Sequence, residues 1–547
     1  MHFKAVFKEM FIFALENIHK IIIGMKKIVL FALCIVMAFG VSAQMVSKKF
    51  VQMKDVDMFR RNALLLENNE DQFVEYLYPR VGGKKMVEHT LAVFNKNKRS
   101  FNYHKVVFST PHFLETAFDM GEEYFASYTY VEKKSTVYCT GKLPKAGTQN
   151  ARTKNRLTIP TKAVWSTHVE SPDGKLHAVI LLAAFKKTPS KAYVFVYDSK
   201  GEEVSFKEFA PSTRYPLFAF SEAALSNNGD MTMLFISYEK KGKQEVNAFN
   251  MPLFNTLFGK APGDPKNTSL HIATISDGDV TEYRIPHFSF GEIHSAGILQ
   301  LDNGTCFIGG YYGEEASKPS IGYFSCIFDP NSENIVETRN SMLPEEQKAQ
   351  DKHMFLIHLK YRIYVQDIVQ LANGNVVMLG EHRAYAVQTQ RVGNTTFTEF
   401  SNWASDVVYQ TFDKNGDSQR SDMVRKLQSH TTNAYLPLET FSPLVFCFHD
   451  YCLSYSSFVK GNDIYLIYNN SLEHDKYCST TPLNYGKACM RLTKLSPDGQ
   501  VDYKTIMKCD TRKSYFQRLW LTDEDGTVYI CTNGKQGYGI ESFEVKD

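Results

Sequence analysis

The sequence is short of three features that would each indicate a class of protein: cysteine, net charge and long apolar runs. Its 547 residues include only 10 cysteines, too few for a disulfide-stabilised scaffold. Lys and Arg together number 62 against 59 Asp and Glu, so no basic excess indicates a nucleic-acid-binding protein. No stretch of about 20 consecutive apolar residues, the length that spans a bilayer, is present. We therefore expect no nucleic-acid partner and no transmembrane span in the mature chain.

One shorter apolar stretch near the start indicates export. Residues 25–43 read MKKIVLFALCIVMAFGVSA, in which Lys26 and Lys27 precede an apolar stretch at 28–40 and a small-residue cleavage signal. This pattern predicts a signal peptide over 25–43 with cleavage before Gln44. We expect the mature chain to be periplasmic, on the outer surface or extracellular.

Residues 1–24, which precede this signal, are interpreted as the product of a start codon assigned too early. The alternative is a membrane anchor, but Glu16 and Lys20 interrupt the apolar residues of this segment. Removal of residues 1–43 takes away five lysines and two glutamates and leaves 57 basic and 57 acidic residues. A formally neutral mature chain again argues against nucleic acid.

Nine cysteines remain in the mature chain, and two local pairs among them could form disulfides in an oxidising compartment. These pairs are Cys447 with Cys452 and Cys478 with Cys489. The alternative is that they are buried thiols, which pack as small hydrophobic side chains. A zinc site at Cys447 and Cys452 would need a second ligand pair at metal spacing, and the sequence offers none. We expect no metal and no cofactor.

What the sequence does contain is a recurring turn followed by a strand-like run. LDNGTCFIGGYYGE at 301–314 and LANGNVVMLGEHR at 371–383 share this pattern. Asn-Gly and Asp-Gly favour the positive φ angles of tight hairpin turns, and the aromatic and β-branched residues that follow favour strands. Each copy therefore predicts a hairpin. The glycines of these turns are Gly121, Gly174, Gly229, Gly304, Gly374, Gly461 and Gly526.

A second hairpin follows in most units and completes a four-stranded antiparallel sheet with a more polar outer strand. Repeated sheets of this size predict an all-β fold, a β-propeller of about seven four-stranded blades, with six or eight as alternatives. A β-sandwich would not repeat its turn residues so regularly. The best helical candidate is DMFRRNALLLENN at 57–69, ahead of the repeats.

The chain is predicted to divide into an upstream segment with the signal peptide (1–43), an N-terminal segment (44–110) and the propeller repeats (111–547). The last unit ends in GIESFEVKD without an outer strand. We expect the N-terminal segment to supply closing strands, and the strand-like runs at 89–108 are the candidates.

Two motifs lie within this repeat. Residues 367–381 fit the pattern D-I-V-x-L-x-N-G-x-V-V-x-L-G-E, and residues 454–470 fit S-Y-x-S-F-V-K-x-x-x-I-Y-L-I-Y-N-N. With them, the segment 364–505 resembles part of a family of secreted β-propeller-like repeat proteins of Gram-negative bacteria whose activity is not established. The family usually has an aromatic residue, often Trp, where this chain has Tyr503. The resemblance implies a propeller-like fold and export, and it supplies no catalytic residues.

The inner strands of a propeller end around a central channel, and ligands usually bind at one of its mouths. Polar residues before or within these predicted strands are therefore the candidates for ligand binding, together with a Glu-His-Arg cluster at the end of a second strand. The alternative is that they only satisfy inner-strand backbone groups and bridge waters. No catalytic residue is assigned. The candidates are His168, Glu222, His294, Asp367, Glu381, His382, Arg383 and Arg518, with Gln517 beside the last.

A binding or scaffold module without catalysis is the expected function, with an unknown protein or glycan as partner. The alternative is a glycan-processing hydrolase that uses carboxylates at the propeller mouth, for which Glu222, Asp367 and Glu381 are available. Exposed tyrosines such as Tyr311 and Tyr312 could stack on sugars, although packing between blades also requires large aromatic side chains.

Two further features concern loops. DKNGD at 413–417 and DEDG at 523–526 resemble parts of a calcium loop, but the twelve-residue ligand spacing fails, so both are interpreted as hairpin turns. Long polar loops are expected at 384–402 and 471–488, where they could form a recognition surface on a rigid scaffold.

Overall fold

The computed structural model describes residues 46–544 with gaps, of which the largest are 54–60, 80–86, 239–267, 435–453 and 472–487. Strands dominate the described residues, and a short 3-10 helix, η2 (Glu345–Gln347), lies among them. In the described part, no helix has the length and apolar character needed to cross a membrane.

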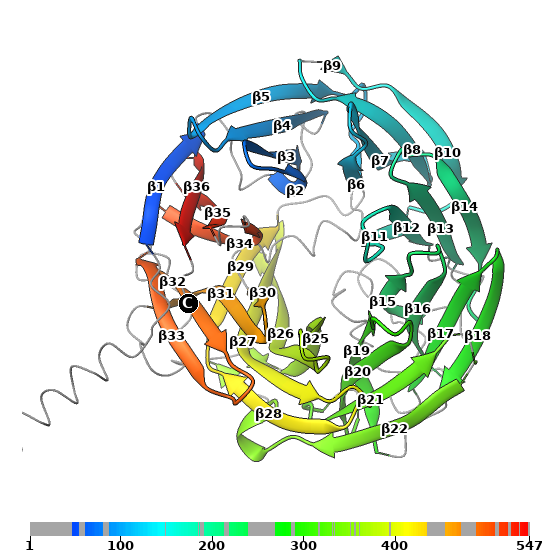
Figure 1. Ribbon diagram of the computed structural model, residues 1–547, viewed down its shortest axis with the longest axis vertical. Coiled ribbons are helices and arrows are strands. Elements are labelled where there is room, and N and C mark those ends of the chain that lie inside the picture. The colour runs from blue at the N-terminus through cyan, green and yellow to red at the C-terminus, as the bar shows by residue number, and fades with distance from the viewer. Residues whose placement is uncertain are drawn as a thin grey trace, which may run out of the picture. The chain divides into compact units, whose positions relative to one another are not determined.

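The chain divides into two compact units. The larger comprises 49–521 and 529–541, and the smaller gathers 1–48, 522–528 and 542–547. The larger unit contains seven antiparallel four-stranded sheets, which succeed one another along the chain between residues 61 and 508. These sheets are named blades 1 to 7. In each, the first strand lies nearest the centre and the last lies at the periphery, as Figure 1 shows.

The blades have the following strands, given from the inner to the outer edge. Blade 1 contains β2 (Arg61–Asn68), β3 (Gln72–Pro79), β4 (Glu88–Asn95) and β5 (Ser100–Val107), with β9 (Gln149–Asn150) added outside β5. Blade 2 contains β6 (Phe113–Asp119), β7 (Glu123–Glu132), β8 (Ser135–Pro144) and β10 (Thr153–Ile159). Blade 3 contains β11 (Val164–Glu170), β12 (Leu176–Ala183), β13 (Lys191–Asp198) and β14 (Glu203–Phe209). Blade 4 contains β15 (Phe218–Leu225), β16 (Met231–Tyr238), β17 (Thr268–Ser276) and β18 (Asp279–Ile285).

The remaining blades follow the same order. Blade 5 contains β19 (Glu292–Gln300), β20 (Cys306–Gly313), β21 (Gly322–Asp329) and β22 (Asn334–Met342). A small pair, β23 (Lys352–Met354) and β24 (Ile357–Leu359), precedes blade 6. Blade 6 contains β25 (Arg362–Gln370), β26 (Val376–Val392), β27 (Thr395–Phe412) and β28 (Ser418–Val424), and β29 (Gln428–Ala434) also pairs with β27. Blade 7 contains β30 (Ser456–Lys460), β31 (Asp463–Ser471), β32 (Ala488–Leu495) and β33 (Val501–Lys508).

An eighth four-stranded sheet joins strands from the two ends of the chain. Its order is β1 (Val46–Met53), β36 (Gly537–Glu544), β35 (Thr527–Gly534) and β34 (Lys513–Thr522). The predicted β-propeller class is confirmed. The strand beside β36 is β1, which lies within the N-terminal segment 44–110, but the candidate range 89–108 was wrong, because it forms β4 and β5 of blade 1.

Two other local predictions were wrong. The helical candidate at 57–69 contains β2, which pairs with β3, and Leu66 of this strand is buried in the core. Residues 384–402 are not a polar loop, because β26 and β27 extend into a long antiparallel ribbon through this range. Pairing between β26 and β27 thus provides hydrogen-bond partners for the backbone groups of this polar stretch. The other predicted loop, 471–488, lies almost entirely outside the described residues.

The two copies of the repeat form the same turn. Gly304 (φ 85°) and Gly374 (φ 83°) both adopt the left-handed conformation that the Asn-Gly pattern predicts. The amide of Gly304 donates to the carbonyl of Leu301 at 2.9 Å, and that of Gly374 donates to Leu371 at 2.8 Å. A different hairpin turn at 413–417 uses Asp413 Oδ1 to accept from the Asn415 and Asp417 amides, both at 2.9 Å, as predicted for a turn. Residues 523–526 lie outside the described residues.

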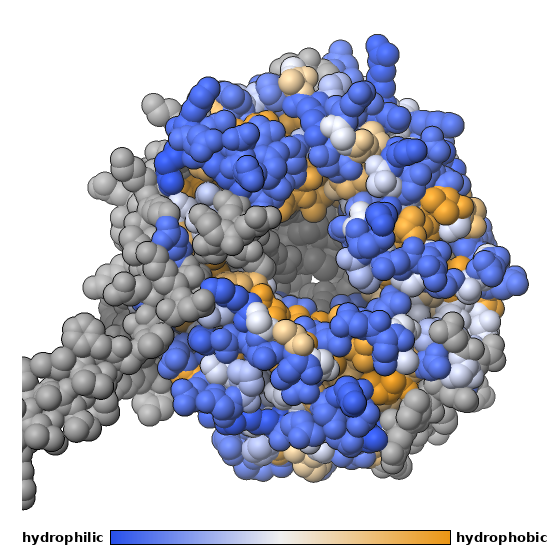
Figure 2. All heavy atoms as spheres, viewed as in Figure 1, coloured by the Kyte–Doolittle hydropathy of each residue, from blue (hydrophilic) through white to orange (hydrophobic). Residues whose placement is uncertain are grey.

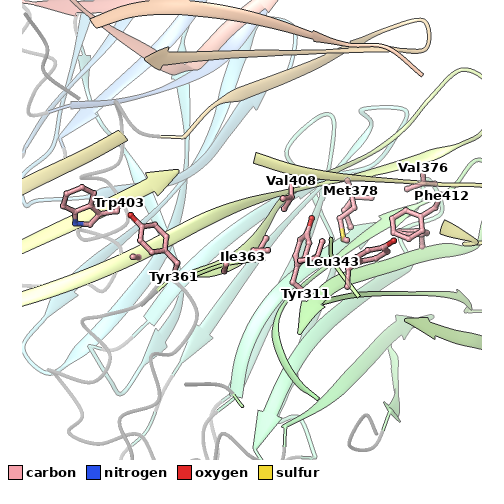
Figure 3. Close-up of a cluster of buried hydrophobic side chains, with 14 of the residues drawn as sticks. Tyr311, Leu343, Tyr361, Ile363, Val376, Met378, Trp403, Val408 and Phe412 are labelled. Atoms are coloured by element: carbon pink, nitrogen blue, oxygen red, sulfur yellow. The ribbon is translucent and has the colours of Figure 1, made fainter. Parts of the chain in front are cut away.

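The hydrophobic core lies between neighbouring blades. Between blades 5 and 6, Tyr311 and Leu343 lie in one cluster with Ile363 and Val408, as Figure 3 shows. Equivalent clusters join each of the other consecutive pairs from blade 1 to blade 7. Burying one large apolar side chain contributes about 1.5–3 kcal/mol, so these interfaces provide most of the stabilisation. In Figure 2, hydrophobic side chains come into view around the central hollow and between blades, while the visible face is mostly hydrophilic.

Candidate functional site

Two acidic side chains occupy equivalent positions on inner strands. Glu222 on β15 and Asp367 on β25 each follow a β-bulge and lie seven residues before the hairpin glycines Gly229 and Gly374. The equivalent residue of blade 5, seven residues before Gly304, is Gly297. Bulges redirect side chains, which explains how these acids reach the next blade.

Glu222 is used in a contact between blades 4 and 5. Its Oε2 accepts a hydrogen bond from the amide of Ile298 at 2.8 Å. A Cβ on Gly297 would lie 2.8 Å from the same oxygen. Desolvation raises the pKa of Glu222 to about 7; the Ile298 amide opposes this rise and Asp367 adds to it. Glu222 as a whole is half-buried.

Asp367 makes the corresponding contact between blades 6 and 7, where Ser457 donates to its Oδ2. Desolvation raises its pKa as well, against the hydrogen bonds from Ser457 and the Ile368 amide. The structure therefore brings Glu222 and Asp367 near enough to interact electrostatically, but each carboxylate has its own protein donor.

Glu115 on β6 is an inner-strand acid that the sequence did not single out. It accepts hydrogen bonds from Thr129 in its own blade and from Ser166 in blade 3. Desolvation raises its pKa to about 7, opposed by Thr129. The sequence feature that could have identified Glu115 is its position in the apolar run before the turn at Gly121.

His294 belongs to a buried network between blades 5 and 6. Its Nδ1 lies 2.7 Å from Ser320 Oγ and its Nε2 lies 3.1 Å from the carbonyl of Glu315. The amide of Ile363 donates to Ser320 Oγ at 2.9 Å. Desolvation, with a smaller effect of Arg362, lowers the pKa of His294 to about 3, so the ring is neutral.

His168 on β11 stacks on His177 of β12, with ring centroids 5.6 Å apart, and His177 stacks on Phe118 of blade 2 at 3.8 Å. Desolvation lowers the pKa of each histidine to about 4. Among the described residues, no group of three His, Cys, Asp or Glu side chains has the arrangement of a metal site. This histidine pair packs as part of the interface between blades 2 and 3.

A buried charge cluster contains two of the predicted residues. Glu381 contacts Lys426 Nζ through Oε1, and its Oε2 accepts from Arg383 Nε at 2.5 Å. Glu381 and Lys426 have no exposed surface, and Arg383 is 4% exposed. Burial alone would raise the pKa of Glu381, but Arg383 and Lys426 outweigh it and hold the pKa below its usual value. Lys426 Nζ also donates to Gln428 Oε1 at 3.1 Å. One carboxylate thus contacts both cations within the protein.

The remaining candidates do not join this cluster into one site. His382 is buried, with Nε2 3.0 Å from the carbonyl of Gln347. Arg518, like Gln517, lies on β34, and the side chains of both are outside the described part of the structure. Tyr311 and Tyr312 are 0% and 1% exposed, so the expectation that they are available to sugars was wrong; packing between blades buries both.

The predicted disulfides fall mainly outside the described residues. Cys489 is buried on β32, while Cys478, Cys447 and Cys452 lie in undescribed segments. Both pairings stay predictions.

An open pocket of about 740 Å³ lies at the outer part of blade 2. It is lined by β7, β8, the segment leading into β10 and the turn at Gly201. Four basic side chains and one carboxylate, Glu123, line it. We name it the basic pocket. Its basic residues are Lys142, Arg152, Lys154 and Arg156.

The basic pocket owes its shape to a detour of the chain. After β8, residues 149–150 leave blade 2 and pair in parallel with β5 of blade 1, before β10 returns to pair with β8. On the return, the carbonyl oxygen of Arg152 lies 2.8 Å from where a Cβ on Gly141 would be. The alternating basic residues of RTKNR at 152–156 were the sequence signal, but the detour that forms the pocket had none.

Comparison with known proteins finds only weak likeness to solved structures. No family model and no curated protein matches the chain. A PL25 ulvan lyase structure bound to -[GlcA(1-4)Rha3S]- is 10% identical with a TM-score of 0.37, covering 85% of this chain and 97% of that one. The polysaccharide lyase Uly1 is 10% identical with a TM-score of 0.33, covering 93% and 100%. A protein of unknown function from Dyadobacter fermentans is 10% identical with a TM-score of 0.34, covering 70% and 95%. At these values, none indicates a ligand or an activity for this chain.

Proposed function

We propose that this protein is an exported, non-catalytic β-propeller that binds a ligand at the rim of a blade. The observation that carries the proposal is the basic pocket, which is open to solvent on rigid strands. Loops and edges held by a rigid scaffold are common places for binding sites.

The inner-strand acids support the non-catalytic part of the proposal. Glu222, Asp367 and Glu381 each contact a donor from the protein itself, and two of these contacts bridge neighbouring blades. A glycosidase needs two carboxylates separated by the sugar and a water molecule or nucleophilic contact. Carboxylates that join blades are poorly placed for that role.

The second candidate is the glycan-processing hydrolase. The observation in its favour is the pKa of Glu222, raised to about 7 by desolvation and then by Asp367, among other effects. A general acid that works near neutral pH requires such a value. Against it stands the packing of this carboxylate onto Gly297.

One protein preparation tests export and distinguishes the binding function from the hydrolase function. The full chain is expressed in a bacterial host, recovered from the exported fraction and sequenced from its N-terminus; a start at Gln44 is expected. The mature protein is then incubated with a panel of polysaccharides, and retention and polymer length are measured together. Retention without shortening is expected. Shortening that disappears in Glu222→Gln and Asp367→Asn would overturn the non-catalytic proposal.

A further inference from the structure

We propose that the basic pocket binds an anionic glycan chain through its carboxylate or sulfate groups. This inference rests on the proposed binding function and names the class of its ligand.

The first argument is that three cations of the basic pocket lack acidic partners. Lys142, Arg152 and Lys154 are exposed, and no carboxylate of the described residues lies within ion-pair distance of them. Arg156 is different, because its Nε donates to Thr140 Oγ1 at 2.9 Å and its Nη1 lies 3.8 Å from Glu203. The positive charge of the first three side chains is therefore available to a ligand.

The second argument is their arrangement. Thr153 pairs with Gly141, so Arg152, which directly precedes β10, and Lys142 on β8 lie at adjacent cross-strand positions. Like charges at neighbouring cross-strand positions destabilise a sheet. An anionic ligand bound between these two side chains would remove that cost.

The third argument is spacing. Side chains two residues apart in an extended chain point to the same face, about 7 Å apart. Lys154 is the second residue of β10 and Arg152 directly precedes this strand, and both line the pocket, so they form a row along it. A row of cations fits a chain that carries acidic groups at intervals better than it fits one small anion. The opposite strand adds Lys142 beside the same row.

The fourth argument concerns what lines the pocket. Its aromatic residue is Phe125, which is 2% exposed and packs in the core. Binding of single-stranded nucleic acid relies on exposed aromatic side chains on which bases stack. Neutral sugars would also need such a surface or a set of paired polar groups. The pocket therefore favours recognition of acidic groups on a glycan.

The experiment uses the mature protein and four probes: dextran sulfate, polygalacturonate, neutral dextran and a single-stranded DNA oligonucleotide. Affinity is measured by calorimetry at about 50 and about 200 mM NaCl, since screening should weaken a charge-dependent complex. Wild type is compared with R152E/K154E and with K142E from the opposite strand. The matched control is K98E/K414E, which reverses two exposed turn lysines that do not line the pocket. Circular dichroism and thermal melting establish that each variant is folded.

We expect dextran sulfate or polygalacturonate to bind and neutral dextran not to bind. Comparison of dextran sulfate with polygalacturonate distinguishes recognition of sulfate from recognition of carboxylate. R152E/K154E should lose affinity by about tenfold or more, and the control double variant should not. Equal affinities of the two double variants would overturn the pocket assignment and leave a binding function elsewhere. Tighter binding of the DNA or of neutral dextran would overturn the ligand class. Binding of none of the probes would also overturn the inference, whereas shortening of a probe would contradict the non-catalytic function.

Discussion

The Oε2 atom of Glu222 in blade 4 lies 2.8 Å from the amide nitrogen of Ile298 in blade 5, and it accepts that amide's hydrogen bond. The neighbouring Gly297 leaves the space that this carboxylate occupies. Blade 6 has Asp367 at the equivalent position. The carboxylate of Glu222 thus occupies space that a side chain at position 297 of blade 5 would need.

Gly297→Ala is expected to destabilise the protein. The new Cβ would lie 2.8 Å from Glu222 Oε2 and 2.9 Å from side-chain carbons of Val365 and Ile368, so the interface must shift. Overpacking of this kind costs about 1–3 kcal/mol. Urea unfolding of Gly297→Ala and Glu222→Ala, alone and combined, measures it. The glycine substitution should cost less where Glu222 is absent; an unchanged cost would contradict the proposed contact.

Glu222→Gln is expected to stabilise the protein at alkaline pH. The folded-state pKa of Glu222 is raised to about 7, so its contribution is fully present below the unfolded value of about 4.5 and is lost as pH rises through 7. Glutamine stays neutral, which should give a gain on the order of 1–3 kcal/mol at pH 8 and little change near pH 4. Chemical unfolding at both pH values tests this, and an equal gain at both would refute the assigned titration.

His294→Gln is expected to weaken the dependence of the free energy of unfolding on pH below about 6.5. The pKa of His294 is lowered to about 3, so the stability of the neutral ring is present above the unfolded value of about 6.5 and declines as pH falls toward 3. The variant should be less stable at pH 7, because Ser320 loses its partner, yet lose stability less steeply between pH 6.5 and 4. Parallel slopes for the two proteins would show that His294 does not titrate on unfolding.

Lys426→Met is expected to cost about 3–5 kcal/mol, because it removes one partner of a fully buried ion pair. Glu381 would retain Arg383 but lose the contact at Oε1. The double variant Glu381→Leu/Lys426→Met should be less stable than Lys426→Met, because it also leaves the buried Arg383 without the Glu381 carboxylate. Guanidinium unfolding of all three proteins measures the effect. A double variant at least as stable as Lys426→Met would contradict the ion-pair explanation.

Local turn chemistry made much of the fold predictable. Gly304 and Gly374 adopt the positive φ angles that Asn-Gly turns favour, and the strands that follow are the second strands of blades 5 and 6. Blade 1 was missed because its first hairpin, at Asn69, contains no glycine. The ribbon at 384–402 was missed because a polar sequence has no apolar alternation to indicate strands.

The candidate site was only partly predictable. Glu222 and Asp367 stood out from the inner-strand pattern, but their partners Ile298 and Ser457 lie far away in sequence. The same holds for Glu381 on β26 and Lys426, which lies in the short segment between β28 and β29. Residue type and spacing cannot reveal such pairs, because each depends on how neighbouring blades pack.

The sequence by itself determined the repeating hairpins, the all-β class and the more polar outer strand of blades such as 3 and 4, because these depend on φ preferences and residue types within a few residues. Only the tertiary structure decided that the inner-strand acids bind neighbouring blades and that β1 lies beside β36. It also decided that the detour through β9 opens a pocket beside Arg152 and Lys142. These features arise from contacts between distant segments, whose free energies depend on burial and on charges brought together by folding.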